Sequence, residues 1–136
     1  MKRRKSALKV VNLEQDMPTV PLALSLLNDA LRMARAEGYA AVKIIHGYGS
    51  SGKGGAIRMA VQAELMQRAR AGELRAVIAG EEWRISDERS WALLQSCPEL
   101  KQDTDLGRGN KGISIVVSDG KRTSRGKARG TATTPV

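Results

Sequence analysis

The spacing of apolar residues alternates between two patterns along the chain, and each change of pattern marks the edge of an expected element. Four short runs rich in Val, Ile and Leu have the composition of β-strands. These runs cover residues 7–13, 41–45, 76–79 and 113–117. Two longer segments between the first three runs carry apolar residues at every third or fourth position instead, which is typical of amphipathic helices.

The first helical segment is expected to begin at Thr19, whose hydroxyl suits an N-cap. Pro21 falls in its first turn, where a missing N–H is tolerated, and Gly38 is expected to end it. The second helical segment is expected to begin near Ala56 and to end at Gly72. The predicted buried stripes are Ala23, Leu27, Ala30, Leu31 and Ala34 in the first helix and Ile57, Val61, Leu65 and Ala69 in the second.

The order β-α-β-α-β-(α)-β predicts a two-layer α/β sandwich. The polar segment before the last strand is expected to hold a short helix over 87–95, capped by Ser86, and then a mobile loop or hairpin over 103–112. Trp83 and Trp91 flank the short helix and are expected to anchor it to the core.

The chain has 136 residues and a formal net charge of +9, which is long enough for one domain with its own core. The charge is concentrated at the ends, because residues 1–9 carry +5 and residues 118–136 carry +4. We therefore expect a basic arm at 1–6, a folded domain at 7–117 and a basic disordered tail at 118–136. Two basic arms on a neutral body predict a polyanion partner; solubility alone is the plainer alternative.

Cys97 is the one cysteine, which excludes an intramolecular disulfide and suits a reducing cytosol. The basic residues at the start are not followed by the apolar region of a secretory signal. No apolar run approaches the length needed to span a bilayer. These features predict a cytoplasmic protein that has no membrane partner.

A glycine-rich stretch over residues 46–55 follows the second strand and precedes the second helix. Glycine allows a ligand to approach the backbone, and the free N–H groups of a helix N-terminus attract phosphate. Lys53 adds a full positive charge, and Tyr48 can stack on a base. The expected phosphate-binding residues are Gly47, Tyr48, Gly49, Gly52, Lys53, Gly54, Gly55 and Arg58.

The sequence His-Gly-Tyr-Gly at 46–49, followed by Gly-Ala-Ile-Arg at 55–58, resembles the signature of the small MutS-related (Smr) domain family. The resemblance covers roughly residues 8–80 and the last strand. It implies a fold similar to the C-terminal domain of bacterial translation initiation factor three. It also implies binding to DNA or RNA, often with endonuclease activity.

The chain departs from the family pattern at the end of the first strand. The family usually carries Leu-Asp-x-His-Gly there, whereas this chain has Leu-Glu-Gln-Asp-Met at 13–17. Glu14 retains the carboxylate of the family Asp, but Asp16 replaces the histidine and Met17 replaces the glycine. The resemblance therefore leaves open whether this chain is an enzyme.

The residue types alone make Glu14, Asp16 and His46 the candidate catalytic group, because the ends of the first two strands can lie side by side. Two carboxylates and an imidazole can bind Mg²⁺ or Mn²⁺, which would activate water for attack on a phosphodiester. Alternatively, His46 acts as a general base toward a 2′-hydroxyl while Lys53 or Arg58 stabilises the developing charge. The plainer interpretation gives the acids and the histidine structural roles only.

Three functions remain open on this sequence: a phosphodiesterase acting on RNA or DNA, a nucleic-acid-binding module that has lost cleavage, and a protein-interaction domain with solubilising arms. Nucleotide binding is a less favoured fourth. The segment from Gly47 to Gly54 approaches the phosphate-binding loop of nucleotide hydrolases, but Gly54 stands where Ser or Thr is needed to bind Mg²⁺.

Overall fold

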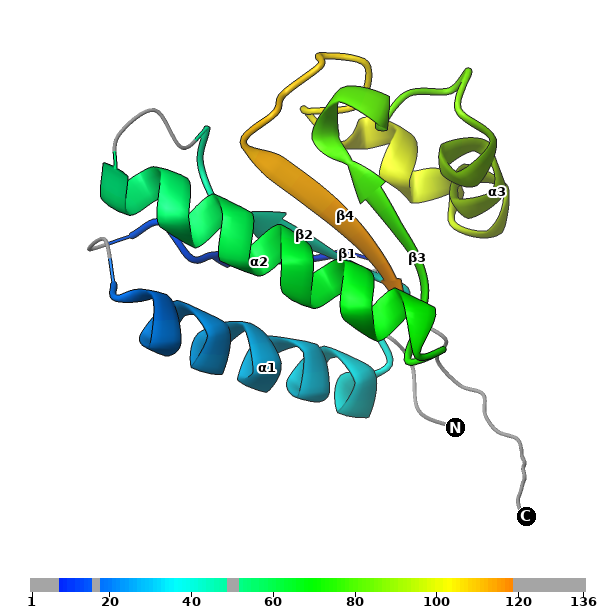
Figure 1. Cartoon of the computed structure of the whole chain (residues 1–136). Helices are drawn as coiled ribbons and strands as arrows, with labels where there is room; N and C mark the ends of the chain where they lie inside the picture. Colours follow the sequence, from blue (N-terminus) through cyan, green and yellow to red (C-terminus); the bar gives the residue numbers. More distant parts are fainter. Residues whose placement is uncertain (1–7, 16–17, 49–51, 119–136) are drawn as a thin grey trace.

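The computed structural model describes residues 8–15, 18–48 and 52–118, which form four strands and three α-helices (Figure 1). The elements in chain order are β1 (Leu8–Asn12), α1 (Val20–Glu37), β2 (Ala41–Ile45), α2 (Gly52–Arg70), β3 (Leu74–Ala79), the 3-10 turn η1 (Gly80–Glu82), α3 (Glu88–Ser96), the 3-10 turn η2 (Pro98–Gln102) and β4 (Ile113–Ser118). No helix in this part of the chain is long and apolar enough to cross a bilayer.

The strands form one sheet in the order β1-β2-β4-β3. β1 runs parallel to β2, whereas β4 runs antiparallel to both β2 and β3. β4 therefore begins at the edge where the other three strands end. We call this the carboxyl edge, and its strand ends are Asn12, Ile45, Ala79 and Ile113. The opposite edge, called the amino edge, is formed by Leu8, Ala41, Leu74 and Ser118.

The mixed α/β class predicted from the sequence is confirmed, and α1 and α2 cover one face of the sheet (Figure 1). The Thr19 hydroxyl accepts a hydrogen bond from the Leu22 N–H at 3.3 Å, and Gly38 ends α1 with φ +81°. Both predicted apolar stripes pack against Val42 and Val116 of the sheet, although Ala69 is only half-buried. The expected similarity to the initiation-factor domain stays a prediction.

The second face of the sheet is covered as well, by α3, η2 and the turns that follow them. Trp83 is fully buried there and packs with Leu94 and Leu100 against Ile115. The segment 103–112, expected to be a mobile loop or hairpin, is a run of turns packed on this face. The expected loop is therefore present, and ion pairs that its polar composition did not reveal connect its turns to the sheet, as described below.

Other expectations need smaller corrections. Trp91 is 44% exposed and does not anchor α3, because Ser90, Leu93 and Leu94 form the buried face of this helix. Asp87, and not Ser86, caps α3, since its carboxylate accepts the Ser90 N–H at 2.9 Å.

Several element boundaries also differ from those predicted, and β1 and α3 each differ by one residue at both ends. β3 begins two residues earlier than predicted, at Leu74, and β4 extends to Ser118. α2 begins at Gly52, four residues before the predicted start, so the glycine-rich loop is shorter than expected. The predicted arm at 1–6 and the tail from 119 onward lie outside the described residues.

Candidate nucleic-acid interface

The candidate site lies at the carboxyl edge, where the residues after β1 and β2 meet the start of β4. Ligand sites of open α/β sheets lie beyond the carboxyl ends of the strands. Leu13 continues the pairing past β1, because its N–H donates to the Ile45 carbonyl at 2.8 Å. This pairing places Glu14 beside the residues that follow β2.

His46 is buried, with 1% of its surface exposed, and both of its ring nitrogens are occupied. Nδ1 lies 3.0 Å from the Gly47 carbonyl oxygen, and Nε2 lies 2.9 Å from Ser114 Oγ. A carbonyl oxygen can only accept, so Nδ1 carries the proton and Nε2 of the neutral ring accepts from the serine hydroxyl. As it is held here, the imidazole has no nitrogen free for a substrate or a metal.

The pKa of His46 lies below its ordinary value. Burial is the main cause, since it disfavours the charged ring, and the positive charge of Arg58 acts in the same direction. The hydrogen bond to Gly47 and the negative charges of Glu14 and Glu81 oppose this shift without overcoming it. His46 is therefore neutral around pH 7.

Gly47 and Glu14 are packed against each other. Gly47 has φ +82°, a conformation that glycine adopts without strain. A Cβ atom at this position would lie only 2.6 Å from Glu14 Oε2. The Asn12 side chain holds the turn that carries Glu14, because its Oδ1 accepts the N–H groups of Glu14 at 2.8 Å and Gln15 at 3.0 Å. The backbone conformation favours glycine at position 47, and a side chain there would also have to displace the end of the exposed Glu14 side chain.

Hydrogen bonds from the segment before β4 hold the Gly47 turn in place. The Gly112 carbonyl accepts the N–H groups of both His46 and Gly47 at 3.0 Å. Asn110 in turn accepts the Gly112 N–H through its Oδ1 at 2.8 Å. Gly80 allows this segment to approach closely, since a Cβ atom there would lie 1.8 Å from the Asn110 carbonyl oxygen.

A buried charge network connects this support to the middle of the sheet. Lys43 is 5% exposed, and its Nζ lies 2.7 Å from Asp103 Oδ1 and 2.6 Å from Asp105 Oδ2. Asp105 also accepts from Asn110 Nδ2 at 3.0 Å, and Asp103 accepts from Trp83 Nε1 at 2.9 Å. A continuous chain of hydrogen bonds therefore runs from Lys43 through Asp105 and Asn110 to the Gly47 turn.

The pKa directions agree with this pairing. Burial by itself lowers the pKa of Lys43, but the hydrogen bonds and charges of Asp103 and Asp105 outweigh it and raise the pKa above its ordinary value. The hydrogen bond from Asn110 is the largest influence on Asp105 and, together with Lys43, lowers the pKa of that carboxyl group. Lys43 and Asp105 are thus both charged around neutral pH.

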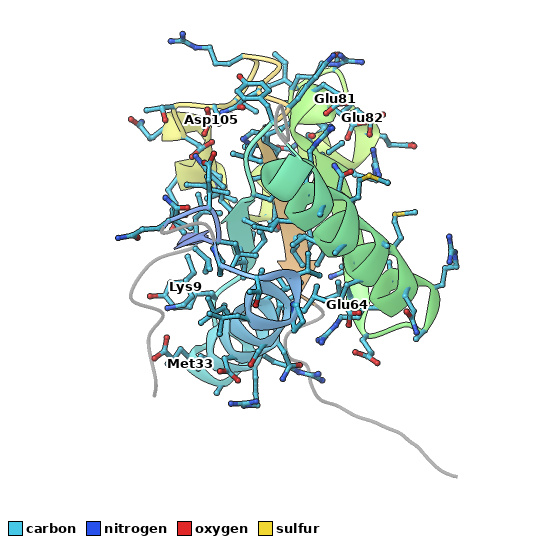
Figure 2. The ribbon with its side chains drawn as sticks, turned by 60° about the vertical axis from the view of Figure 1, so that its left-hand side comes forward. Lys9, Met33, Glu64, Glu81, Glu82 and Asp105 are labelled. Atoms are coloured by element: carbon cyan, nitrogen blue, oxygen red, sulfur yellow. The ribbon has the colours of Figure 1, made fainter. Side chains whose placement is uncertain are left out.

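Arg58 is the cationic residue of the site. It belongs to α2, and its buried Nε has no hydrogen-bond partner among the described residues. Glu81, which follows β3, is the functional candidate that the sequence interpretation missed; its charge reaches His46. The sequence feature that could have identified Glu81 is its position two residues after the third apolar run. Figure 2 shows Glu81 and Asp105 at one end of the molecule, with Lys9 and Glu64 toward the other.

The structure brings together only part of the residue set predicted from the sequence. Tyr48 follows the Gly47 turn and is 63% exposed, as a stacking residue would need to be. The backbone of Gly52, Lys53, Gly54 and Gly55 forms the start of α2 instead of a loop. Asp16 and Gly49 lie outside the described residues. Within the described part of the chain, no group of three metal-binding side chains comes together.

Comparison with known proteins gives two matches. The structure is similar to the crystal structure of the Smr domain of Thermus thermophilus MutS2, with 24% sequence identity, a TM-score of 0.49, and coverage of 81% of this chain and 96% of that chain. No curated protein matches the sequence. The family model of the Smr domain matches residues 16–82. On that match over about half of its length, the chain is assigned to the Smr domain family.

Proposed function

We propose that this protein binds nucleic acid through backbone phosphates at the carboxyl edge of its sheet. The observation that carries the proposal is Arg58, a cation whose buried Nε lacks a partner among the described residues. It lies in the second turn of α2, and the unpaired N–H groups of the preceding first turn favour an anion. Smr domains are generally associated with nucleic-acid binding and nicking endonuclease activity, which supports the same ligand class.

The neighbouring residues fit a phosphate cradle. The exposed ring of Tyr48 is available to stack on a base next to a bound phosphate. Gly47 leaves no side chain between the backbone and a ligand, and the sequence interpretation assigns Lys53 to the same phosphate-binding set. We place this activity in the cytosol, in keeping with the lone Cys97.

We assign His46 a positioning role instead of a catalytic one. Its neutral ring links the Gly47 carbonyl to Ser114 and thus holds the turn that carries Tyr48. Endonuclease activity is the second candidate function, and Glu14 favours it, since this exposed carboxylate lies against Gly47. The described residues do not form a metal site, so we derive no step through Mg²⁺ or Mn²⁺.

The test measures binding and cleavage separately. Labelled single-stranded RNA, single-stranded DNA and supercoiled DNA are incubated with the full chain, each with Mg²⁺, with Mn²⁺ and with EDTA. Arg58→Gln should weaken binding about tenfold or more, because it removes a charge-assisted contact. Lys101→Gln, which removes one charge from the α3 face, is the matched control and should bind like the unaltered protein.

Cleavage that is lost in Glu14→Ala and Asp16→Ala but retained in Lys101→Gln would establish the nuclease. Binding without cleavage would establish the binding module. Equal binding by the Arg58→Gln and Lys101→Gln variants would contradict the phosphate site proposed here.

A further inference from the structure

The turn that precedes β4 carries cations at the carboxyl edge that the proposed function does not use. Arg108 and Lys111 lie in the segment 107–112, and both are exposed. Neither side chain makes an ion pair or a hydrogen bond with any described residue. Their charges are therefore available to a ligand.

Backbone contacts place Lys111 beside the Gly47 turn. The carbonyl of Gly112, the next residue, accepts the N–H groups of His46 and Gly47 at 3.0 Å. A Cβ atom at Gly112 would lie only 3.4 Å from the Gly47 carbonyl carbon. The turn before β4 therefore continues the surface that carries Tyr48.

A second backbone contact brings Arg84 to the same region. The Gly107 N–H donates to the Trp83 carbonyl at 2.8 Å, which holds the backbone of residues 107–108 next to that of residues 83–84. Arg84 is exposed, and its guanidinium donates to the Glu81 backbone carbonyl at 3.3 Å but to no carboxylate among the described residues. Three exposed cations, which we call the edge cations, thus lie between η1 and the Gly47 turn: Arg84, Arg108 and Lys111.

The backbone of the turn also offers donors to an anion. Gly107 and Gly109 have φ values of +79° and +67°, and successive N–H groups in such turns form anion-binding concavities. The N–H groups of Gly109 and Lys111 donate to no described residue. Phosphate oxygens accept from cationic side chains and from backbone N–H groups, so both features fit one ligand.

The edge cations change the balance of charge at the candidate site. Glu14 and Glu81 lie at the same edge, and among the described side chains these two acids outnumber Arg58. When the edge cations are included, the positive charges exceed the negative ones. An excess of positive charge is what a strand of phosphates requires.

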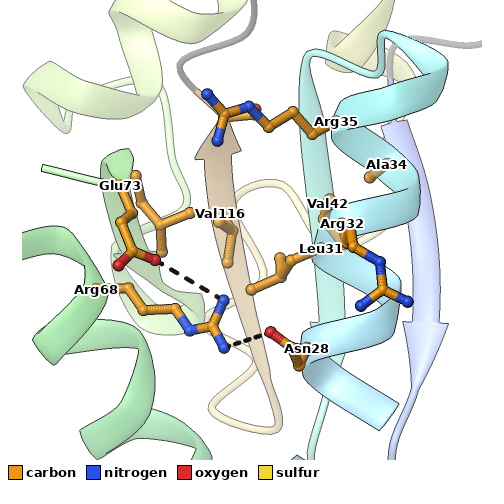
Figure 3. Close-up of a pocket in the computed structure, with 11 residues that line it drawn as sticks. Asn28, Leu31, Arg32, Ala34, Arg35, Val42, Arg68, Glu73 and Val116 are labelled. Atoms are coloured by element: carbon orange, nitrogen blue, oxygen red, sulfur yellow. Dashed lines mark hydrogen bonds and ion pairs between the residues drawn. The ribbon is translucent and has the colours of Figure 1, made fainter. Parts of the chain in front are cut away.

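The other arginine-rich surface of the domain does not offer the same charges. A groove between α1 and α2 is lined by Arg32, Arg35 and Arg68 (Figure 3). Arg68 pairs with Glu73, which itself lines the groove, and Arg32 pairs with Asp29. Of the three arginines, only Arg35 has no ion pair with a described residue. The carboxyl edge is therefore the surface that fits phosphates.

We infer that the edge cations form a second phosphate subsite at the same edge as Arg58, which binds the sugar–phosphate backbone of the same nucleic-acid strand. The ligand class rests on the proposed function, whereas the position of the subsite rests on the backbone contacts of Gly107 and Gly112. Contacts to phosphates hold a strand without reading its bases. The subsite therefore adds affinity and salt dependence, but no sequence preference.

The competing explanation is that Arg108 balances the charge of the ion triad, which consists of Lys43, Asp103 and Asp105. The triad brings two carboxylates to one ammonium group, and the charge of Arg108 acts on Asp105. For Arg108→Gln, a lower melting temperature with unchanged nucleic-acid binding would overturn the assignment of Arg108 to the subsite. Weakened binding by the folded variant would support it.

The experiment measures binding of the full chain to a labelled single-stranded 20-mer, as RNA and as DNA, by anisotropy at several salt concentrations. The edge variant replaces all three edge cations by Gln, and Arg58→Gln is measured beside it. All measurements are made at a temperature at which circular dichroism shows every variant to be folded. The matched control removes the same charge from three exposed positions elsewhere: Arg35→Gln, Arg70→Gln and Lys101→Gln.

The edge variant should reduce the slope of log K against log salt by about 2, because each phosphate neutralised on a single strand accounts for about 0.7. The control should keep the slope of the unaltered protein. An edge variant with the slope of the control would overturn the inference, and weakened binding by Arg58→Gln would then leave the proposed function standing.

The opposite pattern, a reduced slope in the edge variant and normal binding by Arg58→Gln, would support the subsite and overturn the phosphate site at Arg58. No binding by the unaltered protein, even at low salt, would overturn both.

Discussion

His46 Nε2 lies 2.9 Å from Ser114 Oγ, a contact between residues 68 positions apart in the chain. The bond exists because β4 returns antiparallel beside β2, with Ser114 opposite Ile44. It occupies the nitrogen that a catalytic base or a metal ligand would have needed. His46 therefore connects the Gly47 turn to β4 by hydrogen bonds and does not offer a ring nitrogen to a ligand.

Protonation of His46 is expected to destabilise the fold. The pKa of this residue in the folded protein is lower than in the unfolded chain, mainly because the ring is buried. The neutral ring therefore contributes stability that is present above pH 6.5 and is lost as the pH falls through the folded-state pKa. Melting temperatures measured from pH 8 to pH 5 should fall over this range, and the fall should be smaller in His46→Gln. An identical pH dependence in the two proteins would show that the ring does not titrate in this way.

Replacement of Gly47 by alanine should be more damaging than the same change at Gly72. Both residues have φ +82°, but a Cβ at Gly72 meets nothing within 4 Å, whereas at Gly47 it meets Glu14. Gly72→Ala thus measures the backbone cost alone, about 1–2 kcal/mol. Gly47→Ala should cost slightly more in chemical denaturation, because the end of the exposed Glu14 side chain must also move aside.

The excess cost should disappear when Glu14 is also shortened. The double variant Gly47→Ala/Glu14→Ala should therefore be more stable than the sum of its single variants predicts. If the changes in the free energy of unfolding are strictly additive, the Glu14 carboxylate does not contact the side chain at position 47 in solution.

Loss of Lys43 should destabilise the domain strongly. Lys43→Met leaves Asp103 and Asp105 without their cation in a mostly buried position, a kind of change that costs about 3–5 kcal/mol. Urea denaturation of this variant and of Arg84→Met, an exposed arginine, gives the comparison. A difference of less than about 1 kcal/mol between them would mean that the triad is not an important source of stability.

The ion triad also predicts behaviour at extreme pH. The lowered pKa of Asp105 gives stability that is present above pH 3.8 and is lost as the pH falls through the folded-state value. The raised pKa of Lys43 gives stability that is present below pH 10.5 and is lost as the pH rises through its folded-state value. Asp105→Asn should reduce the acid component, which can be followed by circular dichroism from pH 5 to pH 2.

Deletion of residues 121–136 should weaken nucleic-acid binding about equally for all sequences, because the five basic residues removed carry no means of reading bases. The deletion should also flatten the salt dependence on single strands, by up to about 0.7 in slope for each phosphate that these residues neutralise. A chain of the same length with these basic residues replaced by Gln is the control for tail length. An unchanged slope in both variants would exclude this segment from the interface.

Much of the architecture follows from local patterns in the chain. The apolar stripes through Leu27 and Val61 predicted two helices that pack on the sheet, and Gly38 and Thr19 predicted where the first one ends and begins. The α2 boundary was missed because glycines are poor helix residues, yet three of them lie in its first turn. Intrinsic helix propensity is therefore a weak guide to where this helix begins.

The sequence by itself determined the α/β order, because the spacing of apolar residues is a local property of the chain. Only the tertiary structure decided what the polar residues do. Lys43 forms a hydrogen bond with Asp105, which lies 62 residues later in the chain, and His46 forms one with Ser114, which lies 68 residues later. Both pairings depend on the insertion of β4 between β2 and β3, a choice of strand order that no local pattern records. The same order brings Leu8 and Val117 to one edge of the sheet, on either side of Ala41.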